Sequence, residues 1–400
     1  MLVDTDRSAM RALLTMLALC LALPASAAAD ALDVTSNTSY RLNPGQESVS
    51  VKVQVRMTNR KAPTFSIEPC SPGSSQRCRF KTTYYWHEWN WVCAPVGARD
   101  IRSSPGVRLR LAKSTKHYKC YRITFPNLHY GQTRRFDVKY TLPGGKPRSK
   151  HETRVLDAYS YFCWYGQPGD RGSVSVRMPP GYEATTWWGK TITKSNRKGT
   201  TITGRFDGDP GKFYACTDAS KPSRMLRTKV KGPDGQRVTI EAWPEDPEWS
   251  KTMAEAVERV LPRLERLLGE PMPLDTVTIR EVTEQSLDGY GSEFWLRHAI
   301  IRLGDHIDSP VNLARGLAMA WFNHRRIRDT WLQIGLSYWA GHKASGEACD
   351  WPGTYPGKGK PKLRTWKRLK ERPTEKLEAI VDWQYDAACR IVQRLSLIHI

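Results

Sequence analysis

The stretch SVSVKVQV at residues 48–55 alternates between valine and a small or polar residue at every position. Side chains of a β-strand point to the two faces of its sheet in turn, so the four valines form one apolar face. The same alternation recurs in three later stretches, which glycine and proline turns separate from one another: residues 134–142, 172–178 and 200–206. This pattern predicts a β-rich, sandwich-like region over residues 30–236.

The pattern becomes helical after residue 244. Asp246, Pro247 and Glu248 are an N-cap, a proline at the first helical position and an acid in the first turn. Apolar residues then recur on one helical face as far as residue 268. Two strand-like stretches and three more helices follow, which we expect at residues 276–282, 298–303, 309–323, 328–342 and 374–400. The chain is therefore predicted to be α+β in class, with a second domain over residues 237–400.

The composition is that of a folded, basic protein. Of 400 residues, 62 are Lys or Arg and 40 are Asp or Glu, which gives a formal net charge of +22 at pH 7. A hydrophobic fraction of 40% excludes a disordered or collagen-like chain. Beyond the N-terminus, no apolar run reaches the roughly 18 residues of a transmembrane helix. The excess positive charge predicts attraction to anionic surfaces.

The two ends of the sequence differ from the rest. Residues 1–29 combine an apolar stretch with small residues suited to cleavage, which predicts a signal peptide and a secreted, extracellular or periplasmic protein. Met10 is an alternative start that leaves a cleaner signal. Residues 396–400 look foreign to the domain, so we expect the second domain to be truncated at its C-terminus. Nucleic acid is not an expected partner of an exported protein.

Eight cysteines remain once the signal peptide is excluded. An even number, with no C-x-x-C motif, favours disulfides over a zinc ribbon or a thioredoxin-like centre. Eight cysteines allow about 105 connectivities, and we expect the one in which neighbours along the chain pair. The expected bonds are Cys70–Cys78, Cys93–Cys120, Cys163–Cys216 and Cys349–Cys389.

Two phrases between residues 313 and 340 carry the most specific signal. Residues 315–322 read RGLAMAWF and residues 329–336 read DTWLQIGL. They resemble the H-E-L-A-H-Q-W-F and D-T-W-L-x-E-G-L phrases of the aminopeptidase-N family of gluzincin zinc metallopeptidases, in which two histidines and a glutamate bind zinc. The resemblance implies a partial thermolysin-like (gluzincin) α/β domain over residues 237–400. It also implies that residues 30–236 are similar to the β-rich N-terminal domain of those aminopeptidases.

The residues that perform the chemistry in that family are missing here. By the resemblance, Arg315 and Met319 stand at the two histidine positions, Gly316 at the catalytic glutamate and Ile334 at the glutamate ligand. An arginine repels zinc, a thioether matches it poorly and isoleucine offers no donor atom. The spacing between Met319 and Ile334 suits the peptidase MA-like branch. We therefore expect a pseudopeptidase with no metal, no cofactor and no catalytic residue.

A further resemblance concerns ligand binding. Residues 290–293 (YGSE) resemble the glycine-rich exopeptidase strand of the aminopeptidase family, in which an acid grips the amino terminus of a peptide. Glu293 would match that acid. We therefore expect a secreted, catalytically inactive protein that binds peptides or an anionic cell-envelope polymer, and its candidate binding residues are Glu293, Arg315 and Tyr290.

Two alternatives stay open. The first is an active secreted zinc metallopeptidase with atypical ligands, and the candidates for those ligands are His298, His306, His324 and His342. The second is a carbohydrate-binding cell-envelope protein, in which the aromatic run at residues 84–91 stacks on sugars, although alternating aromatics more often pack in a core. In either case the basic cluster at residues 358–370 is a candidate contact for wall polymers or anionic lipids.

Overall fold

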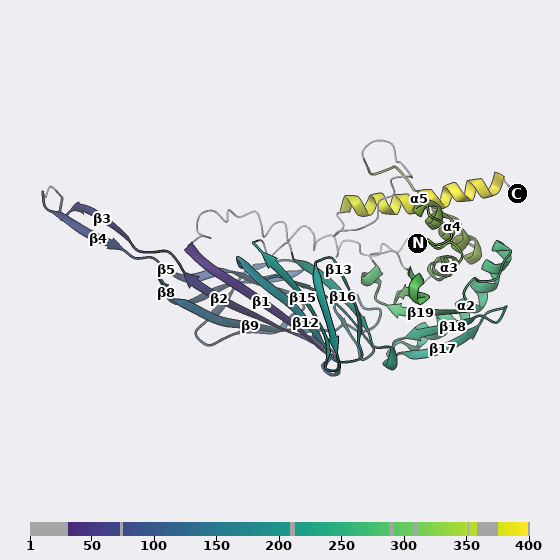
Figure 1. The fold of residues 1–400 in the computed structure, drawn as a ribbon, viewed down its shortest axis with the longest axis horizontal. Coiled ribbons are helices and arrows are strands. Elements are labelled where there is room, and N and C mark those ends of the chain that lie inside the picture. Colours follow the sequence, from purple (N-terminus) through teal and green to yellow (C-terminus); the bar gives the residue numbers. More distant parts are fainter. Residues whose placement is uncertain are drawn as a thin grey trace. The chain divides into compact units, whose positions relative to one another are not determined.

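Figure 1 shows the fold of the chain in a computed structural model. The structure describes residues 31–398, apart from 73–74, 209–212, 288–291, 307–309, 351 and 358–374. The predicted signal peptide, the candidate binding residue Tyr290 and the basic cluster at 358–370 lie outside the described residues. No helix of the described part is both long enough and apolar enough to cross a membrane.

The chain forms two compact units. The first unit comprises Met1–Gly144 with Phe162–Thr217, and the second comprises Gly145–Tyr161 with Asp218–Ile400. The expected boundary after residue 236 is not where the units divide. It falls in the hairpin of β17 (Leu226–Lys231) and β18 (Arg237–Ala242), whose strand pairing holds both sides of that position in the second unit.

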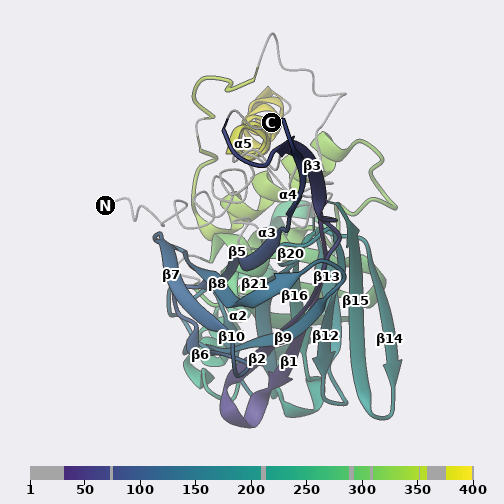
Figure 2. The ribbon, with the colours of Figure 1, turned by 90° about the vertical axis from the view of Figure 1, so that its left-hand side faces the viewer.

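A seven-stranded sheet is the larger layer of the first unit (Figure 2). Its strand order is β14-β15-β12-β1-β2-β9-β6, in which β1 pairs antiparallel with β2 and parallel with β12. The four valines of residues 48–55 are all buried, and the residues between them are not. The four strands predicted from alternation are confirmed. The strands are β1 (Leu32–Asn43), β2 (Ser48–Asn59), β6 (Arg99–Ser103), β9 (Thr133–Pro143), β12 (Arg171–Met178), β14 (Thr191–Asn196) and β15 (Gly199–Asp207).

Smaller sheets pack on this layer through aromatic rings. Tyr40 of β1 stacks on Phe162 at 6.3 Å between ring centroids, and Phe136 of β9 lies 6.5 Å from the ring of Trp89. The first unit is therefore a two-layered, sandwich-like arrangement. The strands of the smaller sheets are β5 (Tyr85–Pro95), β7 (Arg108–Ser114), β8 (Tyr118–His129), β11 (Tyr159–Tyr165), β13 (Glu183–Trp187) and β16 (Tyr214–Ser220), and the short β10 (Arg154–Val155), which pairs with β11, belongs to the second unit.

The aromatic run at residues 84–91 does not form one exposed platform. Trp89 lies in the core with 9% of its surface exposed, whereas Tyr85 at the other end of the run is 51% exposed. Trp164, on a neighbouring strand of the first unit, is fully buried and donates its indole N–H to Thr217 Oγ1 at 2.8 Å. These tryptophans serve the core of the first unit because it needs large apolar side chains between its layers.

All eight cysteines of the described residues are bonded in pairs. Cys70–Cys78, Cys93–Cys120 and Cys163–Cys216 lie in the first unit, and Cys349–Cys389 lies in the second. The four bonds are the neighbour pairs expected from the sequence. The first of them links the two strands of a separate ribbon, β3 (Thr64–Pro69) and β4 (Arg77–Thr82).

The second unit contains a five-stranded sheet of order β17-β18-β19-β21-β20. Its three middle strands are parallel, and an antiparallel strand lies at each edge. Helices α2, α3 and α4 lie beside this sheet (Figure 1). Their buried side chains form one apolar core with those of the middle strands. The remaining strands are β19 (Thr276–Val282), β20 (Ser292–Trp295) and β21 (Ile300–Gly304), and the α-helices are α2 (Pro247–Leu268), α3 (Val311–Ala318), α4 (Thr330–Ser345) and α5 (Glu375–Ile398).

Local sequence explains where these helices begin and end. The side chain of Asp246 accepts a hydrogen bond from Trp249 N and caps α2, as its sequence predicts. The helix expected over residues 309–323 is shorter than predicted, because α3 ends at Ala318. Asn323 donates to Ala320 O and accepts from Arg325 N, and these bonds compete with a continued helix. Short 3₁₀ turns complete the chain: η2 (Pro44–Gln46), η4 (Pro222–Arg224), η5 (Glu284–Leu287) and η6 (Leu296–His298).

The parallel pairing of β1 and β12 depends on a glycine. A Cβ atom at Gly172 would overlap the backbone oxygen of Ser36 and the ring of Phe206, whereas a Cβ at Gly45 would meet nothing within 4 Å. We expect Gly172→Ala to destabilise the protein by about 2 kcal/mol and to lower Tm by roughly 4–8 °C. Thermal melting of Gly45→Ala provides the control, and equal Tm values for the two variants would contradict this account.

Candidate functional site

Helices α3 and α4, which carry the two family-like phrases, pack unusually closely. A Cβ atom at Gly341 of α4 would lie 2.8 Å from the backbone nitrogen of Arg315 on α3. A glycine at this point lets the two backbones approach. The side chain of Arg315 is therefore held against α4, and it contacts residues that lie one and two turns before the end of that helix.

Arg315 is held by neutral groups. Its Nη1 donates to Asn312 Oδ1 at 3.2 Å, and its Nη2 lies 2.7 Å from His342 Nε2. Its guanidinium carbon lies 4.0 Å above the ring of Tyr338. No acidic side chain among the described residues forms an ion pair with Arg315. Since Arg315 is half-buried, its positive charge is partly withdrawn from water without being neutralised.

The protonation states of its neighbours preserve that charge. Burial, and then the charge of Arg315, lowers the pKa of His342 from 6.5 to about 4, so the ring is neutral near pH 7. The Nε2 atom of His342 therefore accepts the hydrogen bond from Arg315, which places the ring proton on Nδ1. Burial also raises the pKa of Tyr338 to about 12, although Arg315 opposes this shift, so the phenol stays neutral.

The other positions of the family-like phrases also lack metal-binding or catalytic groups. Ile334 is 8% exposed and packs in a cluster with Tyr338 and the cysteines of the disulfide between residues 349 and 389. A Cβ atom at Gly316 would lie 2.6 Å from Cγ2 of Ile301 on β21, so the Ile301 side chain would have to shift to admit a larger residue. Met319 is half-buried at the C-cap of α3.

The described residues contain no group of three or more His, Cys, Asp or Glu side chains that could hold a metal ion. Three of the four histidines considered as displaced ligands, at positions 298, 306 and 324, are exposed, and His342 is buried against Arg315. The structure therefore does not gather these four histidines into one site.

Glu293, the candidate anchor for a peptide amino group, has a partner that the sequence did not suggest. It lies on β20 directly opposite Arg302 of β21, and its Oε2 lies 2.5 Å from Arg302 Nη1. The Arg302 side chain is only 1% exposed, and it also pairs with Asp218 Oδ2 at 2.6 Å. Burial alone would lower the pKa of Arg302, but the carboxylates of Asp218 and Glu293 outweigh it and raise that pKa. Glu293 is thus paired within the second unit, but it shares one guanidinium with Asp218, and Arg302 alone does not balance both acids.

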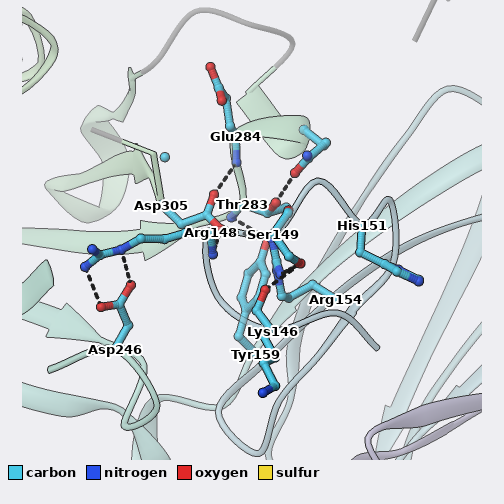
Figure 3. Close-up of polar contacts among 12 residues, drawn as sticks. Lys146, Arg148, Ser149, His151, Arg154, Tyr159, Asp246, Thr283, Glu284 and Asp305 are labelled. Atoms are coloured by element: carbon cyan, nitrogen blue, oxygen red, sulfur yellow. Dashed lines mark hydrogen bonds and ion pairs between the residues drawn. The ribbon is translucent and has the colours of Figure 1, made fainter. Parts of the chain in front are cut away.

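A second charged cluster lies at the carboxyl ends of the parallel strands and was missed by the sequence analysis (Figure 3). We call it the strand-end cluster. Asp305, which follows β21, accepts from Arg154 Nη2 at 3.0 Å, from Arg148 N at 3.1 Å and from Glu284 N at 3.1 Å. Arg154 and Asp305 are both almost fully buried. The other members of the cluster are Asp246 and Glu281.

The remaining bonds of the strand-end cluster are also internal. Arg148 grips Asp246 with two hydrogen bonds, of 2.9 and 2.6 Å, and Asp246 caps α2 at the same time. Glu281 is fully buried and accepts from Trp243 N at 2.7 Å. Burial raises the pKa of Glu281 well above 4.5, and the carboxylates of Asp246 and Asp305 raise it further, while the bond from Trp243 opposes this. The raised pKa favours the neutral form of Glu281, and the two arginines face the two aspartates.

The strand-end cluster therefore has a structural role. Its bonds attach the segment Gly145–Tyr161 to Asp305 at the end of β21 and to Asp246 at the start of α2. A signal for it existed in the sequence. Glu281 lies one residue before the end of the strand at residues 276–282 and Asp305 directly follows the strand that ends at residue 304, and ligands of parallel sheets gather at such strand ends. The arginines that contact this cluster of acids, Arg148 and Arg154, lie more than a hundred residues before Asp305 in the sequence, and no local pattern marks them.

Comparisons with known proteins give a distant likeness. No protein-family model matches the sequence, and no curated protein matches it. Among solved structures, the chain is similar to an M1 zinc metallopeptidase from Deinococcus radiodurans, with a TM-score of 0.35, 15% identity, and coverage of 92% of this chain and 83% of that one. A mutant of that enzyme gives a TM-score of 0.35 at 16% identity, and the same mutant bound to the substrate Tyr-Ser-Ala gives 0.31 at 15%, each with the same coverage.

Removing the acid of the buried pair should be costly. Asp305→Ala leaves the guanidinium of Arg154 buried without its carboxylate, which we expect to cost about 3–5 kcal/mol of unfolding free energy. The matched control is Asp33→Ala, because Asp33 pairs with Arg171 in the first unit, where both side chains are partly exposed. That variant should lose less than about 1 kcal/mol. Denaturant titration of both variants measures these losses of unfolding free energy. Similar losses for the two variants would refute the structural role of the cluster.

Stability should also depend on pH through His342. Its pKa is lowered from 6.5 to about 4 in the folded state, so its stabilising contribution is complete above about pH 6.5 and is lost as the pH falls toward about 4. The loss corresponds to roughly 3 kcal/mol. We expect the difference in unfolding free energy between the parent and His342→Gln to change by that order between pH 7 and pH 4. The exposed His306→Gln variant is the control and should follow the parent throughout this range.

Proposed function

We propose that the chain is a secreted, catalytically inactive relative of gluzincin zinc aminopeptidases, and that it binds the carboxylate of a peptide or of an anionic envelope polymer at Arg315. One observation carries the proposal: a half-buried guanidinium, held only by neutral described groups, stands at the position of the first zinc ligand of the family-like phrase. In the related enzymes that position serves a cation. Here the side chain itself is the cation.

The contacts of Arg315 leave it able to bind an anion. A guanidinium has five N–H donors in a planar fork, and Asn312 and His342 account for two of them. Carboxylates bind such a fork through two parallel hydrogen bonds. The ring of Tyr338 supports the flat face of the guanidinium and so helps to fix its plane. Because His342 and Tyr338 are neutral, neither competes with an incoming anion.

The same two helices also lack the groups that catalysis by a zinc peptidase requires. A peptidase of this kind needs a carboxylate base and three metal ligands. Gly316 has no side chain, and Cγ2 of Ile301 lies where one would begin, while Ile334 lies in an apolar cluster with a disulfide. Four disulfides are typical of proteins from oxidising compartments, which supports secretion together with the predicted signal peptide.

Binding of a tripeptide tests the proposal. We expect Ala-Ala-Phe with a free carboxylate to bind more tightly than its C-terminal amide, because a charge-assisted pair with an arginine contributes about 1.5–3 kcal/mol, or roughly ten- to a hundredfold in Kd. Arg315→Gln should lose this preference, whereas Arg325→Gln, which removes an exposed arginine nearby, should keep it. Titration calorimetry of the oxidised protein gives the Kd values, and polyglutamate serves as the polymeric probe.

Two results would overturn the proposal. Equal Kd values for the acid and the amide would show that Arg315 is not a carboxylate site. One tightly held zinc ion per chain after dialysis, measured by elemental analysis, would favour the active metallopeptidase instead. Glu293→Gln is measured in the same series. If Glu293 anchors the free amino group of the peptide, this substitution should weaken peptide binding. Unchanged binding by both Glu293→Gln and Arg315→Gln would remove both residues from consideration.

A further inference from the structure

The ribbon of β3 and β4 is a part of the first unit that has no core of its own. The two strands pair with each other and form a separate two-stranded sheet, which extends beyond β5 and β8 in Figure 1. An isolated two-stranded ribbon is marginally stable in water at best. Here a disulfide between Cys70 and Cys78 links its strands, so its order does not depend on burying its side chains.

One face of the ribbon combines an apolar row with a cationic row. Residues directly opposite one another in an antiparallel pair share a face, and the opposed pairs of this face are Phe65 with Lys81, Ile67 with Arg79 and Pro69 with Arg77. The β3 side is thus apolar and the β4 side is basic. All six residues are exposed, with 53% of Phe65 and 64% of Ile67 accessible to solvent.

Neither row is explained by packing within the ribbon. The Arg79 guanidinium lies 4.1 Å above the ring of Phe65, which is the one contact across this face that the structure describes as an aromatic or charged pair. Ile67 has the larger exposed fraction and no apolar partner that would bury it. Counted over residues 60–82, five basic residues stand against one acid, Glu68. A long exposed apolar edge normally invites aggregation, and the basic β4 strand opposes pairing with a second copy.

We propose that this face of the ribbon binds the surface of an anionic lipid bilayer. Lys and Arg beside a membrane are attracted to anionic headgroups, and apolar side chains on the same face gain by entering the boundary between headgroups and acyl chains. The apolar row decides between lipids and a hydrated anionic polymer. A hydrated polymer could pair with the three cations and stack on the ring of Phe65, but it has no apolar surface against which Ile67 could be buried. A hydrocarbon phase beside anionic headgroups interacts favourably with both rows.

This surface is independent of Arg315, which lies in the second unit. Binding to a bilayer would concentrate the protein at a membrane, whatever the site near Arg315 recognises. The proposal therefore adds a location to the proposed function and does not need that function to be correct.

Vesicle co-sedimentation of the full, oxidised chain tests the inference. We expect binding to vesicles that contain phosphatidylglycerol and little binding to pure phosphatidylcholine. Ile67→Ser should weaken binding to the anionic vesicles about tenfold. The triple variant Arg77→Gln, Arg79→Gln, Lys81→Gln should weaken it about a hundredfold, since each basic residue near the surface contributes about a factor of five.

The strands β14 and β15 offer matched controls in the same unit. Ile192 on β14 is 66% exposed, and Lys194, Arg197 and Lys198 are exposed near it. Ile192→Ser and the triple variant Lys194→Gln, Arg197→Gln, Lys198→Gln make the same chemical changes at another hairpin. Both should bind anionic vesicles like the parent. Unchanged Tm values and an absence of free thiols confirm that every variant is folded with its disulfides intact.

Three outcomes would overturn the proposal. The parent protein could fail to bind either vesicle. Ile67→Ser could bind like Ile192→Ser, which would reduce the attraction to charge alone. Soluble dextran sulfate could bind the parent as tightly as the vesicles do, with no effect of Ile67→Ser, which would identify a polyanion and not a bilayer as the partner. Arg315→Gln should leave vesicle binding unchanged, so failure here and failure of the carboxylate site are told apart.

Discussion

The carboxylate of Asp305 holds several elements of the second unit together. It follows β21 directly and accepts hydrogen bonds from two residues of the segment Gly145–Tyr161 and from the turn after β19. The parallel strands, the segment and the capped start of α2 meet within one set of buried ion pairs. A buried charge is costly unless it is paired and hydrogen-bonded. If these elements moved independently, a buried arginine or aspartate would lose its partner, and the folded state would be destabilised.

Local pattern predicted the elements well and long-range pairing poorly. The alternation at residues 48–55 and the Asp-Pro-Glu start of α2 were sufficient to predict β2 and α2, because period and capping are properties of a few consecutive residues. The end of α3 was predicted too late, because Asn323 acts through its side chain and not through its helix propensity. The place of Gly145–Tyr161 in the second unit had no local signal, since its partners lie far away in the sequence.

The candidate site shows the same division. The sequence identified Arg315, Gly316 and Ile334 as positions where zinc chemistry is missing, because a motif can be checked residue by residue. It did not identify Tyr338 and His342 as the residues that hold the guanidinium, although both lie on the helix of the second phrase. The signal that could have found them is spacing, since residues four apart on α4 share the face that meets α3. A neutral histidine beside an arginine is a property of burial, and no sequence pattern reports burial at a single residue.

The contact between Gly316 and Ile301 has a consequence for what sequence change can achieve. The atom nearest to a Cβ at position 316 would be Cγ2 of Ile301, at 2.6 Å, so a larger residue there must displace this β-branched side chain, which is followed on β21 by the buried Arg302. Variants with a larger residue at position 316 would therefore lose stability unless Ile301 became smaller at the same time. The packing of one methyl group thus makes the residue tolerated at position 316 depend on the residue at position 301, although the two lie in different elements of the second unit.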